Sequence, residues 1–419
     1  MKQIQREPQA LRTRVLILLL LAYILNFLDR NVAGILAVPI RSEFHLSDTA
    51  LSGLGVAFGL FYATVAVPIA WLADRRSRVN IIAVSVALWS MFSAACGIAS
   101  TYAQLIIARM AVAVGEAGAI APSYSLITDY YPRERRSRAL AVYSFGIPIG
   151  SALGLFFGGW LAGHFSWRAA FVAVGLPGLF VAILIKFLVA EPERGRFDPQ
   201  LKITSSPARL AAGSLARNGS FWLLSLGAAS GSITGYGLLF WLPSFFNRTF
   251  GMPVAETGMF FGSIFLTGGI AGIWLGGWLG DRLGPSHPGA YALIPAFCLL
   301  FAIPLYAAGL FAPNLTVVWI LFTFAQVLAL AWLGPVVTAV QHIVTPALRA
   351  TASASFLFIN NLVGIAFGTF FFGWFSDAMK AARGANSLQY SILYGLGFYL
   401  LGSVFYLTAA ARLKRDLAS

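Results

Sequence analysis

Long apolar runs recur from one end of this chain to the other, and each is about as long as a bilayer is thick. A helix needs about 20 apolar residues to cross the ~30 Å hydrocarbon core of a membrane. Because the runs are continuously apolar rather than alternating, they favour helices over a β-barrel. The sequence therefore predicts an all-α membrane protein with twelve transmembrane helices, at 15–40, 50–72, 79–100, 102–128, 138–162, 168–190, 220–243, 257–280, 289–310, 315–342, 350–374 and 389–411.

The placement of charge predicts the orientation of the chain. Only 11% of its 419 residues are charged, against about 25% in soluble domains. With the N-terminus inside, 21 Lys and Arg residues fall on the cytoplasmic side, and the opposite side receives five, Arg41, Arg168, Arg248, Lys380 and Arg383. This bias follows the positive-inside rule. It accounts for the net charge of +14 without a nucleic-acid partner. We therefore expect a multi-pass protein of the inner (plasma) membrane with both termini in the cytoplasm.

Signals for processing and for enzyme chemistry are absent from the sequence. Residues 1–14 are polar and basic, and no small-residue cleavage site follows the first apolar run, which predicts a cytoplasmic tail rather than a signal peptide. Cys96 and Cys298 lie in apolar runs and indicate neither a disulfide nor a metal site. No HExxH, GxSxG or GxxxxGK[ST] string occurs. We expect no enzyme activity, catalytic residue, metal or cofactor.

The chain divides into two halves that resemble one another. A Pro-containing linker at 191–219 separates a bundle at 15–190 from one at 220–411, and 412–419 forms a second tail. "WLADR" at 71–75 returns as "WLGDR" at 278–282. Each half holds an even number of spans, so the copies have the same orientation about a pseudo-two-fold axis along the membrane normal. This arrangement predicts transport by alternating access.

A second repeat has a constant spacing of 214 residues and contains matched glycines. Gly150 and Gly154 correspond to Gly364 and Gly368. Small residues four apart let helix backbones approach closely in lipid. We expect these glycines to serve helix packing rather than to bind a substrate.

The 6+6 repeat and the loop strings "ADRRSR" and "GDRLG" resemble the major facilitator superfamily. This resemblance implies a cytoplasmic gate held by charged residues after the second and eighth helices. The second copy, "GDRLGPSHP", lacks the later basic residues of the pattern. The matching positions are Asp74, Arg75, Arg78, Asp281 and Arg282, with Asp129 as the acidic partner of the first loop.

Four charged residues lie deep in the apolar runs of the first half: Asp29, Arg30, Arg109 and Glu116. A charge at the bilayer centre costs roughly 2.5–3.5 kcal/mol, so the four should converge on a cavity rather than face lipid. One interpretation is a permanent ion-pair cluster that joins the first helix to the fourth. The other, which we favour, is a proton relay in which Asp29 and Glu116 carry the proton, because arginine stays charged. Arg30 and Arg109 then form the charged network and bind a substrate head group.

The second half has no charge deep in its helices, so it offers only uncharged polar groups to a substrate. One charged half and one apolar, aromatic half suit an amphipathic substrate. The candidate cavity-lining residues are Asn26, Tyr124, Ser232, Tyr236, Gln326, Asn360 and Asn361.

The segment 114–154, with "FLDR" and "EPERGR", resembles the Spinster family of lysolipid and sphingolipid transporters. The resemblance implies transport of an amphipathic lipid, such as a lysophospholipid or sphingoid phosphate. We expect a monomer in the bilayer whose transport is coupled to protons. Proton-coupled symporters of small organic anions, such as sugar acids or carboxylates, share the Asp-Arg pair and the Arg and Glu of the fourth helix, and remain the alternative. The 6+6 repeat gives no support to a channel or a scramblase.

Overall fold

The computed structural model describes residues 9–197, 215, 217–344 and 349–416, and all regular elements in these ranges are helical. Parts of the predicted tails and linker, namely 1–8, 198–214, 216 and 417–419, lie outside the described residues. The boundaries assigned to the tails, the linker and the two bundles therefore stay predictions.

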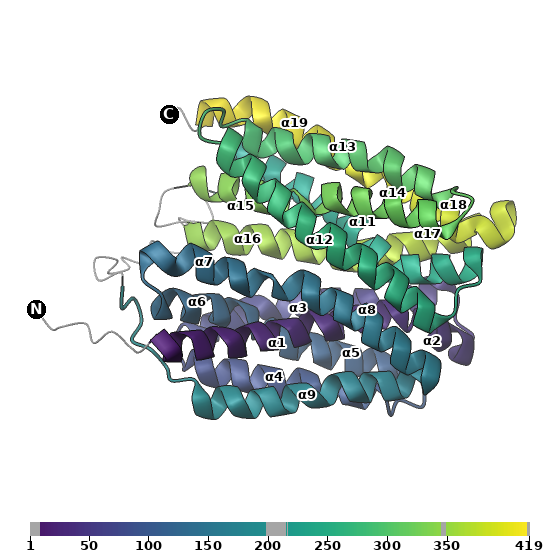
Figure 1. The fold of residues 1–419 in the computed structure, drawn as a ribbon, viewed down its shortest axis with the longest axis horizontal. Coiled ribbons are helices and arrows are strands. Elements are labelled where there is room, and N and C mark those ends of the chain that lie inside the picture. The colour runs from purple at the N-terminus through teal and green to yellow at the C-terminus, as the bar shows by residue number, and fades with distance from the viewer. Residues whose placement is uncertain (1–8, 198–214, 216, 345–348, 417–419) are drawn as a thin grey trace, which may run out of the picture. The chain divides into compact units, whose positions relative to one another are not determined.

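The contacts divide the chain into two compact units. Unit 1 is Met1–Ala33 with Phe61–Lys202, and unit 2 is Gly34–Leu60 with Ile203–Ser419. Within each unit the helices run along a common direction (Figure 1). Unit 1 is built from α1 (Gln9–Ile35), the second half of α3 (Asp48–Ala73), α4 (Arg78–Cys96), α5 (Tyr102–Ala117), α6 (Ile120–Tyr130), α7 (Arg133–Ser144), α8 (Gly146–His164) and α9 (Trp167–Leu188).

Unit 2 contains the helices of the second half of the chain together with the segment 34–60. Its elements are α2 (Ala37–Phe44), the first half of α3, α11 (Gly219–Phe250), α12 (Val254–Leu283), α13 (Ala290–Leu310), α14 (Leu315–Leu330), α15 (Leu333–His342), α16 (Arg349–Asn361), the π-helix η2 (Leu362–Phe367), α17 (Gly368–Arg383), the 3-10 turn η3 (Gly384–Asn386), α18 (Ser387–Gly395) and α19 (Gly397–Asp416).

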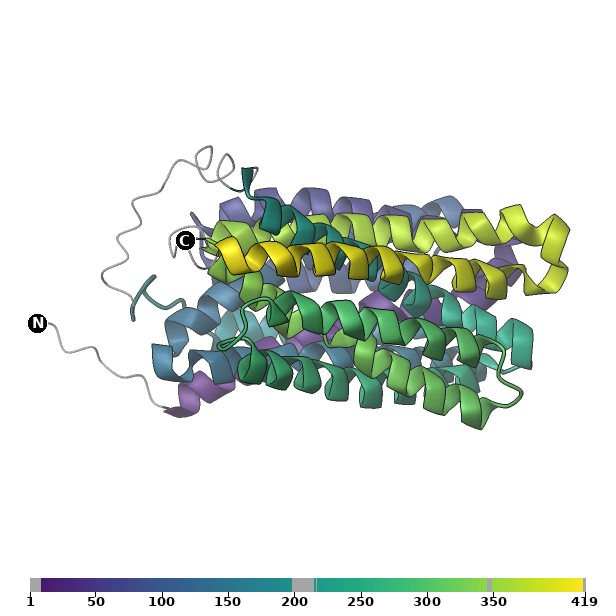
Figure 2. The same ribbon diagram turned by 90° about the horizontal axis from the view of Figure 1, so that it is seen from above.

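The helices account for the twelve predicted spans. Eleven stretches of the described chain are long and apolar enough to cross a membrane. The last of them, Ser355–Leu413, has 59 residues and turns back on itself at η3, where Gly384 has a φ of +55°. Figure 2 shows this reversal between α17 and α18. The long stretch therefore contains two spans, and the expected count of twelve is confirmed.

Five predicted spans are interrupted by a short break rather than being single helices, and the break in 389–411, at Leu396 between α18 and α19, has no proline beside it. In the other four, a proline is the third residue of the segment after the break, a position in the first helical turn where its missing N–H costs little. The same proline cannot bond the carbonyl one turn earlier, so the preceding segment ends there. The prolines are Pro39 in α2, Pro122 in α6, Pro148 in α8 and Pro335 in α15.

The matched glycines make matched contacts inside the two units. In unit 1, a Cβ at Gly150 or Gly154 would collide with the backbone of α1 at Ile24 and Leu28. In unit 2, a Cβ at Gly368 would collide with the backbone of α11 at Ile233. The packing role expected of these glycines is therefore confirmed, and the fifth span packs on the first span of its own half in both copies.

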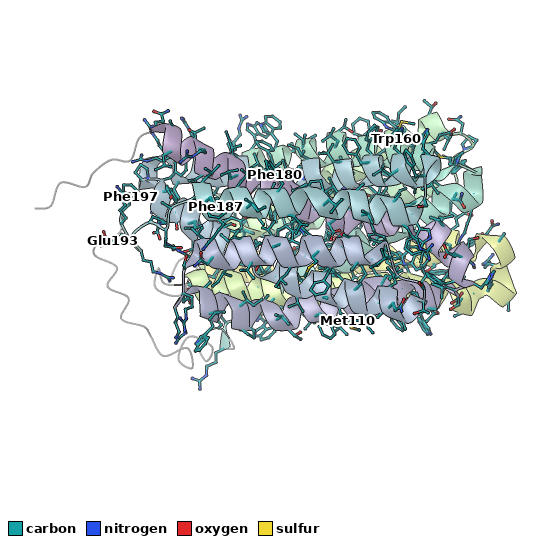
Figure 3. All side chains as sticks on the ribbon, turned by 90° about the horizontal axis from the view of Figure 1, so that it is seen from below. Met110, Trp160, Phe180, Phe187, Glu193 and Phe197 are labelled. Carbon is teal, nitrogen blue, oxygen red and sulfur yellow. The ribbon has the colours of Figure 1, made fainter. Side chains whose placement is uncertain are left out.

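Large apolar side chains cover the outer surface of the helices. On α9, Phe180 is 64% exposed and Phe187 is 78% exposed, and on α8 Trp160 is 40% exposed (Figure 3). So large an exposed apolar surface is unfavourable in water. A hydrocarbon surrounding accommodates it, as expected of a protein that crosses a bilayer.

Candidate functional site

Helices α1 and α5 bring the four charges predicted to lie deep in the apolar runs together as two ion pairs. Arg30 donates two hydrogen bonds to Oε2 of Glu116, from Nε at 3.1 Å and from Nη2 at 2.8 Å. Nη1 of Arg109 lies 3.4 Å from Oδ2 of Asp29. Adjacent residues of α1 thus pair with residues two turns apart on α5. The four side chains therefore meet, and we call these four residues the charged cluster.

Glu116 uses only one of its two carboxylate oxygens. Both bonds from Arg30 end on Oε2, while Oε1 is buried and has no hydrogen-bond partner among the described residues. Asn26, on α1 beside Arg30, accepts a hydrogen bond of 3.3 Å from Arg30 at Oδ1. Its buried Nδ2 has no acceptor among the described residues. Buried polar atoms are nearly always bonded. An acceptor and a donor in this cluster are therefore available to a proton or a ligand.

Asp29 is bonded at both oxygens. Ser93 on α4 donates its hydroxyl to Oδ1, and Arg109 faces Oδ2. Asp29 and Glu116 are equally inaccessible, with side chains 2% and 0% exposed. They differ in how completely neighbours satisfy them, which sequence spacing could not predict.

Aromatic rings flank the guanidinium of Arg30. Its Cζ lies 4.6 Å from the ring centre of Tyr62 and 4.9 Å from that of Phe27. Such contacts stabilise a buried cation. The predicted lining residue Tyr124 lies in a second aromatic group, where its ring is 5.2 Å from that of Tyr143. The cluster thus combines charge with an apolar aromatic surface.

The polar residues predicted for the second half form separate pairs in unit 2. Ser232 on α11 donates to Asn360 on α16 at 2.7 Å, and Tyr236 donates to the neighbouring Asn361 at 3.4 Å. Gln326 on α14 instead accepts a hydrogen bond of 2.8 Å from Tyr306 on α13. Four of these five predicted residues therefore lie where α11 meets α16, and the fifth, Gln326, lies where α14 meets α13.

The loop after α3 is organised around Arg78, which is 2% exposed. Its Nη1 lies 2.5 Å from Asp129 on α6, the acid expected to be its partner. Its Nε lies 2.7 Å from Glu191, the first residue of the predicted linker and of the string "EPERGR", to which the sequence assigned no role in the gate. We call these three residues the loop cluster. The signals for Glu191 were its position directly after the sixth apolar run and its place in "EPERGR", and neither indicated Arg78 as its partner.

Glu191 is an acid held in its ionised form by donors. Burial raises the pKa of its carboxyl, but bonds from the Val79 amide, the Arg78 guanidinium and the Ser77 hydroxyl outweigh burial and hold that pKa below its ordinary value. The carboxylate thus remains charged at neutral pH and keeps Arg78 in place.

The remaining loop charges are solvent-exposed. Arg75 stacks on the ring of Trp71 at 3.8 Å, and Arg282 on that of Trp278 at 5.3 Å. The "WLADR" and "WLGDR" strings therefore repeat as a contact between residues four apart. Asp74 and Asp281 are exposed, and the backbone carbonyl of Asp74 accepts a bond of 2.6 Å from Arg194.

Sequence reasoning missed a third cluster, around Asp48 at the start of α3. Arg248 on α11 donates a hydrogen bond to each carboxylate oxygen of Asp48, at 2.6 and 2.7 Å. The hydroxyl of Ser376 on α17 donates a third, at 2.7 Å. Nε of Arg41 lies 3.2 Å from Oδ1. The signal was available: the side predicted to face away from the cytoplasm has five basic residues, and two of them pair with this acid.

Comparisons with known proteins agree with this architecture. Residues 19–369 match the model of the Major Facilitator Superfamily. The chain is 31% identical over 400 residues to an "MFS-type efflux pump" of Mycolicibacterium smegmatis, covering 94% of this chain and 91% of that protein. It is 30% identical over 438 residues to the human "Protein spinster homolog 1", covering 96% and 81%. The crystal structure of a bacterial homologue of the human lysosomal transporter Spinster, inward-facing and unoccupied, superimposes with a TM-score of 0.88 at 33% identity, covering 98% and 99%.

Proposed function

Because the chain belongs to the major facilitator superfamily, as a transporter of the Spinster type, we propose that it is a proton-coupled secondary transporter that works by alternating access. The charged cluster supports the coupling. A buried carboxylate that keeps one oxygen unbonded can take up a proton at that oxygen without breaking the hydrogen bonds to its other oxygen. Glu116 meets this condition at Oε1.

We assign the two acids different parts in this coupling. Glu116 is the proton carrier, since protonation of Oε1 leaves both bonds between Oε2 and Arg30 in place. Asp29 modulates the cluster, because Ser93 and Arg109 occupy its two oxygens and protonation would disturb one of them. Arg30 then holds an anionic group of the substrate whenever Glu116 is neutral.

The substrate we propose is an amphipathic lipid with an anionic head group, such as a lysophospholipid or sphingoid phosphate. Arg30 supplies the positive charge for the head group. Tyr62 and Phe27, whose rings flank that guanidinium, provide an apolar surface directly beside it. The resemblance of the first half to lysolipid and sphingolipid transporters supports the same substrate class.

We further propose that the loop cluster is part of a gate on the cytoplasmic side, with both termini on that side. The charge asymmetry along the sequence supports this orientation. Arg78 has two acidic partners there, Asp129 and Glu191. Ion pairs that form in one state and separate in another are a common form of conformational switch.

Transport into proteoliposomes tests coupling and substrate together. Wild-type protein should accumulate a labelled lysolipid when a pH gradient is imposed, and Glu116→Gln should lose this dependence on the gradient while still exchanging substrate at equilibrium. Asp29→Asn should slow gradient-driven transport. Glu256→Gln, which removes an exposed acid in the first turn of α12, is the matched control.

Two results would count against the proposal. If Glu116→Gln and Asp29→Asn both retain gradient-driven transport, the charged cluster does not couple protons. If only a small sugar acid or dicarboxylate binds saturably and the lysolipid does not, the substrate is a small organic anion and the lipid assignment is wrong.

A further inference from the structure

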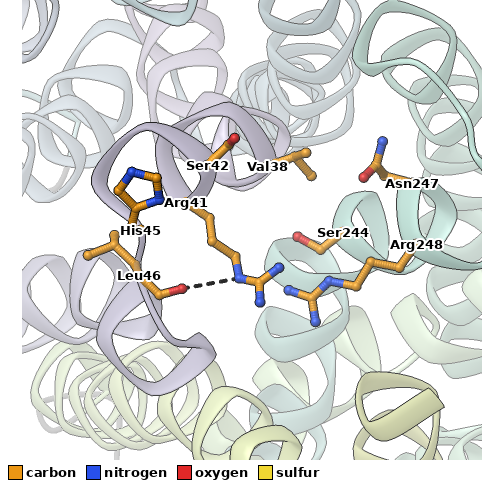
Figure 4. A pocket seen from close by; sticks show the side chains of 8 residues that line it. All are labelled: Val38, Arg41, Ser42, His45, Leu46, Ser244, Asn247 and Arg248. Carbon is orange, nitrogen blue, oxygen red and sulfur yellow. Dashed lines mark hydrogen bonds between the residues drawn. The ribbon is translucent and has the colours of Figure 1, made fainter. Parts of the chain in front are cut away.

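Unit 2 contains a pocket of about 440 Å³ between α2 and the C-terminal turn of α11 (Figure 4). Its polar lining comes from Arg41, Ser42, His45, Ser244, Asn247 and Arg248. The two apolar lining residues are Val38 and Leu46. The pocket is therefore polar, and none of its lining residues belongs to the charged cluster of α1 and α5.

The pocket has more positive charge than its neighbours neutralise. Figure 4 shows the guanidinium groups of Arg41 and Arg248 facing each other. Among the described residues a single carboxylate, that of Asp48, pairs with both of them; Arg248 donates to both of its oxygens, and the Arg41 side chain is 32% exposed. Arg41 reaches Asp48 and the carbonyl of Leu46 only through Nε, and no described residue accepts a bond from its two terminal nitrogens. None of the lining side chains is acidic.

A buried hydroxyl beside the two guanidinium groups also lacks a partner. Ser244 is 1% exposed, and its Oγ makes no hydrogen bond to any described residue. Buried hydroxyls are rarely left unbonded. Helix C-termini favour basic residues, which accounts for Arg41 and Arg248 at the ends of their helices. That preference does not account for an unbonded serine between them.

We propose that this pocket binds a phosphate group, with the terminal nitrogens of Arg41 and the hydroxyl of Ser244 as donors. Arginine presents planar paired donors that match phosphate oxygens. Arg248 would contribute charge while keeping its bonds to Asp48. The scarcity of apolar lining favours a free phosphate or an exposed lipid head group over an acyl chain. This inference concerns a second site and does not depend on the proposed transport of lipid or protons.

Binding to the full-length protein tests the site. In a neutral detergent, titration calorimetry with inorganic phosphate, at ionic strength matched with chloride, should give saturable binding to the wild type. Arg41→Gln should weaken binding at least about tenfold, and Ser244→Ala about threefold to tenfold, as expected for loss of one charged or one neutral donor. Arg383→Gln removes an exposed arginine of α17 that stacks on Tyr390 and should leave binding unchanged.

A second arm identifies the source of the phosphate. Native mass spectrometry of protein from nanodiscs with or without phosphatidic acid should show retained lipid in the wild type, less in Ser244→Ala and least in Arg41→Gln, if a lipid head group is the occupant. Retention in this arm or saturable binding in the first supports the site, provided that it depends on Arg41. Absence of Arg41-dependent binding in both arms, from variants that remain monodisperse, would overturn the proposal.

Discussion

Two buried carboxylates, Asp48 in unit 2 and Glu116 in unit 1, have the same kind of partner but differ in how fully they are bonded. Their side chains are 3% and 0% exposed, and an arginine holds each. Both oxygens of Asp48 are bonded, by Arg248, Arg41 and Ser376. Glu116 has one oxygen with two bonds and one with none. Burial alone therefore does not distinguish these two acids, whereas the number of bonded oxygens does, and we expect the acid with an unbonded oxygen to be the one that takes a proton.

The largest expected effect of this difference is on stability at Asp48. Asp48→Asn removes the charge that offsets Arg248 and Arg41. Breaking a buried pair on one side costs about 3–5 kcal/mol, and we expect the lower end because Arg248 is 20% exposed. Denaturant unfolding of the detergent-solubilised protein measures the loss. Asp281→Asn, at an exposed position on α12, should change stability by less than about 0.5 kcal/mol.

A smaller effect is expected from a single donor to Asp48. Ser376→Ala removes one hydroxyl bond to a charged group, which costs roughly 1.5–3 kcal/mol. Ser244→Ala makes the same chemical change at a buried serine whose hydroxyl is unbonded, so it should be close to neutral. Equal losses in the two alanine variants, measured by the same unfolding assay, would contradict the importance of satisfied bonds.

Glu116→Gln should cost less stability than Asp48→Asn, about 1 kcal/mol, despite the deeper burial of Glu116. The amide oxygen can still accept from Arg30, and the fold must tolerate a neutral side chain here if Glu116 is protonated during transport. Unfolding experiments in parallel with the transport assay measure both properties. A loss larger than that of Asp48→Asn would show that Glu116 is a structural acid and would reverse the comparison.

The smallest effect concerns Glu191, whose pKa is held below its ordinary value. A depressed folded pKa means that the stabilisation is complete above about pH 4.3 and is lost as the pH falls through the lower folded value. The side chain is 30% exposed, so the amount is about 0.5–1 kcal/mol. The wild type should therefore lose slightly more stability than Glu191→Gln between pH 5 and pH 3, and parallel curves would argue against the assignment.

The sequence predicted the features that depend on local composition. Apolar length predicted the spans, and the scarcity of deep charges singled out Asp29, Arg30, Arg109 and Glu116. It could not predict that Arg109 pairs with Asp29 and Arg30 with Glu116, because this depends on how α1 and α5 are rotated against one another.

Contacts between residues far apart in the sequence were also beyond prediction. The partners of Asp48 on α11 and α17 are 200 and 328 residues away. The five basic residues predicted on that side indicate that an acid there can be paired, but they do not say which of them pairs with Asp48. The breaks near Pro39, Pro122, Pro148 and Pro335 were not predicted, because the spans were assigned from apolar length and a proline does not interrupt an apolar run. Their common position as third residue of a segment is visible only with the helix ends known.

The matched glycine contacts have a consequence for how such a protein can change over time. An internal duplication supplies two copies of each helix, and Gly154 on α8 and Gly368 on α17 still meet the first span of their own half in the same way. The faces of the helices away from these contacts are then free to diverge. One half can concentrate ionisable chemistry while the other loses it, and both continue to assemble by the same backbone-to-backbone fit.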